Sequence, residues 1–182
     1  QSGRLLRVDL GGNYDANAAK FAPSGAVTFA DRFNDGTLGV AFALTSDTRR
    51  FASDNVETGG AWEGNKLSAF EMRRYEITRA RLGAALNLDF KPNTDSHFYL
   101  RGFSSRFTDD ESRQSNKISF AKAQAEGASG DAGAARGLKA RQEINRVSSL
   151  TAGADHRMGD WRLWAEAGSG RASEDKPNAL AS

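Results

Sequence analysis

The chain has 182 residues, 38% of them hydrophobic; it has no cysteine, and its 25 basic and 23 acidic residues give a formal net charge of +2. The missing cysteines exclude a disulfide framework and thiolate metal sites, and no run of about 18 apolar residues exists that could form a membrane-spanning helix. The basic residues are scattered among acidic ones, which argues against a nucleic-acid-binding protein. The start of the chain, from Gln1, does not resemble a signal peptide, so the export signal of an exported parent protein would lie outside it.

The first third of the chain contains three segments in which apolar residues alternate with polar ones, a pattern that predicts β-strands with one apolar face. In chain order, the apolar positions of these segments are Leu6, Val8 and Leu10; Gly25, Val27, Phe29 and Phe33; and Leu38, Val40, Phe42 and Leu44. Asp31 interrupts the second segment, because it falls on the apolar parity.

The clearest alternation covers Ala80 to Phe90, where every second residue is apolar and the residues between them include Arg81, Asn87 and Asp89. On a helix these charges would spread around the whole circumference and leave no apolar stripe. The segment is therefore predicted to be a strand with one polar and one wholly apolar side.

Three further alternating segments follow, with many small residues at their apolar positions. These positions are Phe98 and Leu100; Leu150, Ala152 and Ala154; and Trp161, Leu163, Ala165 and Ala167. Alanine fills little of the space between two packed sheets, but a strand facing lipid has no second sheet to meet. The small residues therefore favour a membrane β-barrel, whose strands need apolar residues only at alternate positions.

The predicted connections alternate in length. Asn34 to Gly36, Pro92 to Asp95 and Met158 to Asp160 have the composition of tight turns. Long polar links are expected between them, from Arg49 to Glu71 and from Thr108 to Lys139. For residues 121 to 141, a short helix inside the loop is the alternative interpretation. Short turns at one end and long loops at the other are typical of outer-membrane barrels.

Aromatic residues flank the short turns: Phe33, Phe90, Phe98 and Trp161 lie on or beside the apolar parity. In a barrel they would form an aromatic girdle at the membrane–water interface; in a soluble protein they would cap a core. The predicted fold is all-β, an antiparallel up-and-down segment of a transmembrane β-barrel with about seven or eight strands that does not close on its own. As an isolated sheet with two unpaired edges, it should aggregate in water.

The stretch from Arg74 to Arg113 resembles TonB-dependent outer-membrane receptors. The resemblance rests on Arg74 to Gly83, on Asn87 to Pro92, on Phe98 to Phe103 and on Phe107 to Arg113, in that order. It is strongest over about 40 residues and implies that residues 1–182 are part of the barrel domain of such a receptor, in the outer membrane of a Gram-negative bacterium.

The resemblance also implies a function for the parent protein. Such receptors form a 22-stranded barrel closed by an N-terminal plug, and they take up an iron–siderophore complex, cobalamin or a carbohydrate with energy delivered through TonB. The chain itself lacks a plug and a TonB-contacting segment and has strands for only about a third of that barrel. Its expected partners are outer-membrane lipid, the rest of the barrel and its plug, TonB through the missing part, and a small-molecule nutrient, with no nucleic acid and no cofactor.

A barrel interpretation assigns each face a role. The expected lumen-facing residues are Arg79, Arg81, Asn87, Asp89, Arg101, Arg162 and Glu166. They are candidates for contact with a plug or an anionic substrate. The alternative is that these residues pair with one another across the strands, as a ladder of opposite charges with a purely structural role. The expected lipid-facing residues are Leu82, Leu86, Leu88, Phe90, Phe98, Leu100, Trp161 and Leu163.

No residues predict a metal site or catalysis. His97 and His156 stand alone at strand ends and are expected to be exposed interfacial residues, without a serine at strand spacing that could form a lipase-like pair. The acidic run from Asp109 to Glu111 lacks the spacing of a calcium loop and is expected to form salt bridges, with Arg106 and Arg113 near in sequence. The alternative to the transport function is a soluble or cell-surface all-β binding module, in which Leu86 and Leu88 would belong to a core.

Overall fold

The computed structural model describes residues 3–181, and over that range it is a single antiparallel sheet. The strands are β1 (Leu5–Asp15), β2 (Lys20–Phe33), β3 (Leu38–Glu57), β4 (Trp62–Glu63), β5 (Lys66–Phe90), β6 (Ser96–Gln124), β7 (Ala132–Met158), β8 (Trp161–Asp175) and β9 (Ala179–Ala181). Among these residues no helix is long and apolar enough to cross a membrane.

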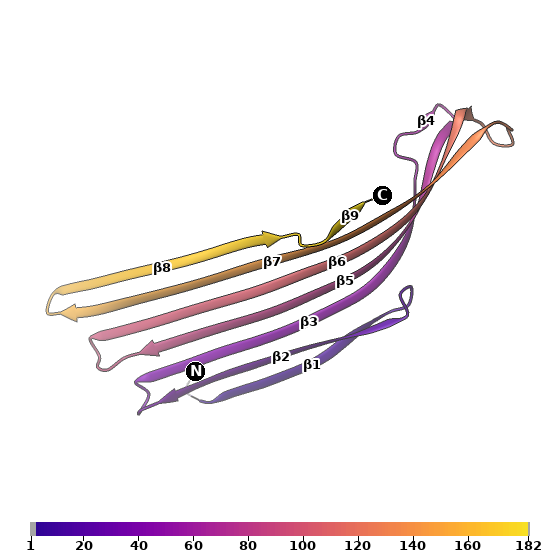
Figure 1. Ribbon diagram of the computed structural model, residues 1–182. Coiled ribbons are helices and arrows are strands. Elements are labelled where there is room, and N and C mark those ends of the chain that lie inside the picture. The colour runs from indigo at the N-terminus through magenta and orange to yellow at the C-terminus, as the bar shows by residue number, and fades with distance from the viewer. Residues whose placement is uncertain (1–2, 182) are drawn as a thin grey trace.

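Seven long strands lie side by side in the order β1-β2-β3-β5-β6-β7-β8, while the short β4 pairs with β5 and the short β9 with β7. The described strands therefore number nine, more than the predicted seven or eight, because two short strands join the seven long ones. β1 and β8 form the two edges of the curved sheet (Figure 1) and are hydrogen-bonded on one side only. The sheet does not close, as predicted.

The three predicted tight turns all connect neighbouring strands at the same end of the sheet, which we call the short-turn end. Asn34 and Asp35 have positive φ angles of 52°, a conformation that these residue types tolerate better than most. The amide of Gly36 donates to the carbonyl of Phe33, and the amide of Thr37 to that of Asn34. β5 and β6 are joined by residues 91–95, and β7 and β8 by only Gly159 and Asp160.

The two predicted long loops are wrong, and so is the helix left open within residues 121–141. β3 runs on to Glu57 and β5 begins at Lys66; β6 runs on to Gln124 and β7 begins at Ala132. Both faces of these stretches are mostly polar, and their few apolar residues, such as Phe70 and Phe120, do not form a regular alternation that would mark them as strands. Backbone pairing and cross-strand ion pairs hold them instead, and the strands reach well beyond their apolar parts toward the far end of the sheet (Figure 1).

The register places the apolar parities of all seven long strands on one face of the sheet. Residues directly opposite one another share a face. Such a line of partners crosses the sheet through Leu6, Phe29, Phe42, Leu86, Gly102, Leu150 and Ser169. We call this side the apolar face and the other the polar face.

No second layer covers the apolar face among residues 3–181, so the sheet has no hydrophobic core. Leu82 is 59% exposed and Trp161 72%, and the buried apolar residues are only Ala22, Ala52 and Ile144. Aromatic pairs such as Phe90–Phe98, with ring centroids 6.3 Å apart, pack along the sheet surface instead. The sheet therefore presents a continuous hydrophobic surface that something else must cover in the functional protein.

The apolar residues form a band that starts at the short-turn end and shifts along the strands from one edge to the other. On β1 the band is centred on Val8, whose line of partners reaches Arg171 on β8. The band on β8, however, covers Trp161 to Ala167 and lies nearer the short turns. Across the seven strands it moves by about one residue per strand, so it runs obliquely to the strand pairing.

Candidate functional site

The polar face carries all seven residues predicted to face a barrel lumen. Arg79, Arg81, Asn87 and Asp89 lie on β5, Arg101 on β6, and Arg162 and Glu166 on β8, and the register puts them on the same side. The eight residues predicted to face lipid all lie on the apolar face. The structure therefore separates the two sets. The seven polar residues fall into two groups, the first further along the strands and the second near the short turns.

The first group is a basic–aromatic cluster on β3, β5 and β6, formed by Arg49, Phe51, Arg79, Arg81 and Phe107. The guanidinium carbon of Arg79 lies 5.3 Å from the ring centre of Phe51, and that of Arg81 5.0 Å from the ring centre of Phe107. Stacking on a ring fixes the plane of a guanidinium and leaves its N–H edge free to bind an anion. Together with the tip of the β1–β2 hairpin, these residues line a hollow on the polar face.

Carboxylates neutralise part of this cluster. Nε of Arg79 lies 3.4 Å from Oδ2 of Asp109, and Nε of Arg49 lies 3.5 Å from Oδ1 of Asp47. Arg81 has no carboxylate partner among residues 3–181, and Arg49 and Arg79 stand directly opposite each other. Since like charges at this distance repel, the cluster has unused capacity for a negatively charged ligand.

The acidic run forms salt bridges, as expected, but with other partners than those near it in sequence. Arg141 on β7 bridges Asp109 at 3.9 Å and Glu111 at 3.3 Å, and Lys139 reaches Glu111 at 3.4 Å. Asp110 points to the opposite face, where it accepts a hydrogen bond from Gln142. Arg106 and Arg113 form no ion pair within the described residues; the basic partners of the run come from the neighbouring strands β5 and β7 instead.

At the far end, Arg73 lies between Glu57 and Glu71, which are direct cross-strand partners. Nη2 of Arg73 lies 2.7 Å from Glu71, and the guanidinium also contacts Glu57. The hydrogen bond from Arg73 lowers the pKa of Glu71, against the opposing effect of partial burial. The same bond raises the pKa of Arg73.

The second group lies near the short turns and centres on Tyr99. Its ring crosses over Gly153, its direct partner on β7, and its hydroxyl donates to Glu166 on β8. A Cβ at Gly153 would lie 2.2 Å from Cζ of Tyr99, so only glycine leaves room for the ring. The guanidinium carbon of Arg101 lies over this tyrosine ring, 4.6 Å from the ring centre.

The two histidines are not isolated as expected, because each has a polar partner; His156 is exposed, as expected, whereas His97 is half-buried. Nε2 of His97 lies 2.7 Å from Oδ1 of Asp89 on the polar face. Nδ1 of His156 lies 2.9 Å from Oγ of Ser96, so a serine partner exists where none was expected. The sequence does not reveal this serine, because it lies on the neighbouring strand, 60 positions away. Ser96 is only 8% exposed, and no carboxylate contacts His156 within residues 3–181. The hydrogen bond therefore serves to link β6 to β7.

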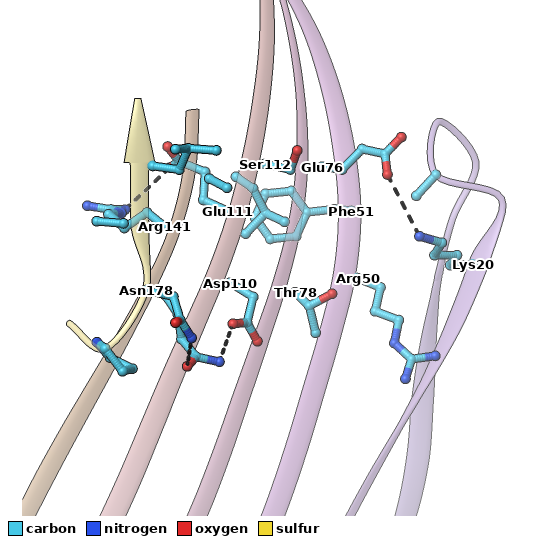
Figure 2. A pocket seen from close by; sticks show the side chains of 17 residues that line it. Lys20, Arg50, Phe51, Glu76, Thr78, Asp110, Glu111, Ser112, Arg141 and Asn178 are labelled. Atoms are coloured by element: carbon cyan, nitrogen blue, oxygen red, sulfur yellow. Dashed lines mark hydrogen bonds and ion pairs between the residues drawn. The ribbon is translucent and has the colours of Figure 1, made fainter. Parts of the chain in front are cut away.

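A second hollow lies on the apolar face beyond the band, where that face turns polar (Figure 2). Arg50, Thr78, Asp110 and Gln142 line it from four neighbouring strands, as direct cross-strand partners. Lys20 reaches Glu76 from one side at 4.0 Å, and Asn178 hydrogen-bonds Gln142 from the other. Because Asp110, Gln142 and Asn178 are already hydrogen-bonded in series, the hollow is a weaker candidate than the basic–aromatic cluster.

Chemically, the polar face offers charged groups and aromatic rings for binding, and no group of three or more potential metal ligands occurs among the described residues. Phe51, Phe107 and Arg141 are the site residues that sequence reasoning missed. All three lie on the polar parity; Phe51 falls inside the first predicted loop, whereas Phe107 and Arg141 stand just outside the two ends of the second. In comparisons with known proteins, no family model matches the chain, and no curated protein or solved structure matches it significantly.

Proposed function

We propose that the chain is a section of the wall of an outer-membrane β-barrel, with the apolar face toward lipid and the polar face toward the lumen. One observation carries this proposal: the apolar parities of seven neighbouring strands coincide on one face, which no other layer covers among residues 3–181. Bare apolar surface of this extent is stable only against another apolar medium. A bilayer supplies one, and in a barrel the remaining strands would pair with the edges β1 and β8.

The oblique apolar band supports the same proposal. A shift of about one residue, or about 3.3 Å, for each step of about 4.8 Å between strands corresponds to a strand tilt of about 35° from the membrane normal. Strands of closed barrels tilt by about 35–45°. On β5 the band covers Ala80 to Phe90, a length that suits a tilted transmembrane strand.

We further propose that this barrel belongs to a TonB-dependent receptor that takes up a scarce nutrient such as an iron–siderophore complex, cobalamin or a carbohydrate. The resemblance of Arg74 to Arg113 to that family supports the assignment. So does the basic–aromatic cluster, because stacked arginines on the lumen side suit an anionic or aromatic substrate, or a plug loop. Transport would require the plug and the TonB-contacting segment of the whole receptor.

A soluble binding module fits less well. In a sandwich, Leu82, Leu86 and Leu88 would pack against a second sheet, and no such sheet exists among residues 3–181. A module that used the apolar face to hold a protein partner would also not need the oblique course of the band.

Fractionation of the full gene product in a Gram-negative host tests the proposal. We expect the protein in the outer-membrane fraction, with a faster gel mobility before boiling than after it, because a closed barrel resists detergent until heated. A soluble protein without a mobility shift would contradict the barrel. For the receptor assignment, uptake of a labelled iron chelate, cobalamin or oligosaccharide should be lost when either this protein or TonB is removed; a barrel whose uptake is independent of TonB would be a different transporter.

A further inference from the structure

Three neighbouring strands repeat one pattern where the apolar band ends. Each carries, at successive positions on the apolar face, a last apolar or glycine residue, then serine, then arginine. The three sets are Gly102, Ser104 and Arg106 on β6; Leu150, Ser148 and Arg146 on β7; and Ala167, Ser169 and Arg171 on β8. The pattern follows the oblique edge of the band: relative to the set on β7, the set on β8 is displaced by two residues toward the short turns, so that Arg171 pairs with Ser148.

The three arginines are exposed and close together. Arg106 and Arg146 are direct cross-strand partners, and Arg171 is diagonal to Arg146. Direct partners have Cβ atoms about 5 Å apart, and like charges in this arrangement destabilise a sheet. Within residues 3–181 none of the three forms an ion pair with a carboxylate. Several arginines on the polar face, among them Arg79, Arg141 and Arg162, do have carboxylate partners, although Arg81 and Arg101 have none among residues 3–181.

We propose that Arg106, Arg146 and Arg171, with the serines beneath them, bind the phosphate groups of a phosphorylated glycolipid, lipid A, in the outer leaflet of the membrane. This inference rests on the proposed barrel, which places the edge of the apolar band at the headgroup level. Guanidinium groups bind phosphate through paired, charge-assisted hydrogen bonds. Serine hydroxyls suit the sugar and phosphate oxygens just above the acyl chains. An anion between the arginines would also remove their mutual repulsion.

The test uses the full gene product, purified in a detergent without phosphate and titrated with diphosphorylated lipid A. Arg146→Gln should weaken binding by about tenfold, the effect of one lost charge-assisted hydrogen-bonding group, and the triple variant R106Q/R146Q/R171Q by more. Arg136→Gln is the matched control: Arg136 is exposed on the same strand and face, ten residues further from the band, and its loss should leave binding unchanged. Lipid A stripped of its phosphates should bind weakly to the unaltered protein.

Two results would overturn the inference: lipid A binding that survives in the triple variant, or inorganic phosphate that competes at the same concentration as the lipid, which would make free phosphate the ligand. The heat-dependent gel mobility of each variant is read in parallel. Lost lipid binding with a retained mobility shift supports the site. A missing mobility shift in the unaltered protein would contradict the barrel itself, whatever the lipid does.

Discussion

On the polar face, a single glycine, Gly153, allows Tyr99 on β6 to reach Glu166 on β8. Tyr99, Gly153 and Glu166 occupy one line across β6, β7 and β8, and the glycine in the middle lets the tyrosine ring lie flat against the backbone. A ring that covers a cross-strand glycine shields the hydrogen bonds of the ladder beneath it and holds the two strands in register. The bond from Tyr99 to Glu166 extends this link to the third strand.

Gly153→Ala should therefore destabilise the folded protein by about 1–3 kcal/mol, because the new methyl group displaces the tyrosine ring. Gly170→Ala is the control, since a Cβ there lies on the same face at an ordinary 3.7 Å from the carbonyl oxygen of Ser148. Urea unfolding of the gene product in lipid vesicles measures both. Equal stability of the two variants would show that the ring does not depend on the glycine.

Acid should loosen the far end of the sheet around Glu71. Glu71 has a lowered pKa in the folded chain, mainly through its hydrogen bond from Arg73, so its contribution to stability is present above the ordinary glutamate pKa of 4.5 and is lost as the pH falls through the lowered value. Hydrogen exchange of the amides around residues 69–75 should accelerate in that acidic range. In Glu71→Gln this acceleration should shrink; an unchanged pH profile would mean that another carboxylate is responsible.

At the scale of the element, β5, β6 and β7 each combine two different stabilising patterns along their length. Near the short turns an apolar side meets a polar side, and further on both sides carry cross-strand charge pairs. The first pattern suits a boundary between lipid and a polar interior, whereas the second suits a wall with water on both sides. A charge should therefore be tolerated on one face of the first part and not on the other.

Leu86→Lys and Ala85→Lys test this difference at adjacent positions of β5. Leu86 is 40% exposed on the apolar face, and a lysine there should cost about 2–4 kcal/mol near the middle of a bilayer and reduce membrane assembly. Ala85 lies on the polar face, so its lysine should assemble normally. The amount of heat-shifting protein in the outer-membrane fraction measures both. Equal assembly would contradict a lipid-facing Leu86.

The sequence was sufficient to predict the strands that have an apolar side. Their faces, the three tight turns and the open antiparallel sheet are all visible in alternation and turn residues, as the segment from Ala80 to Phe90 illustrates. It was not sufficient for the strand ends around Glu57, Glu71 and Arg141. There the alternation is between charges, and the stabilising contacts join residues 30 or so positions apart, which a single sequence does not reveal.

The same limit explains the candidate site. Arg79 and Arg81 could be predicted from their own strand, but Phe51 and Phe107 come from strands whose ends looked like loops. The pairing of Ser96 with His156 depends on the register between β6 and β7, which is set by the whole sheet rather than by either residue.

At the scale of the whole molecule, the sheet is one layer thick with two open edges. β1 and β8 each leave one side of the backbone without strand partners, and such edges pair readily with other chains. The 182 residues produced alone in detergent should therefore self-associate through these edges. Size-exclusion chromatography with cross-linking between β1 and β8 would detect this association; a monomer with protected edges would contradict the prediction.

The reach of β5, β6 and β7 past the apolar band has a consequence for what meets the cell surface. The outer part of β6, from Ser104 to Gln124, spans on the order of 60 Å along the strand. In a membrane-embedded barrel this part would project through the sugar layer of the surface lipids. The connection at residues 125–131 would then be the first part of this chain that antibodies or phage tail fibres encounter, so pressure to escape recognition should fall on this tip, while the banded wall below it stays hidden from immune selection.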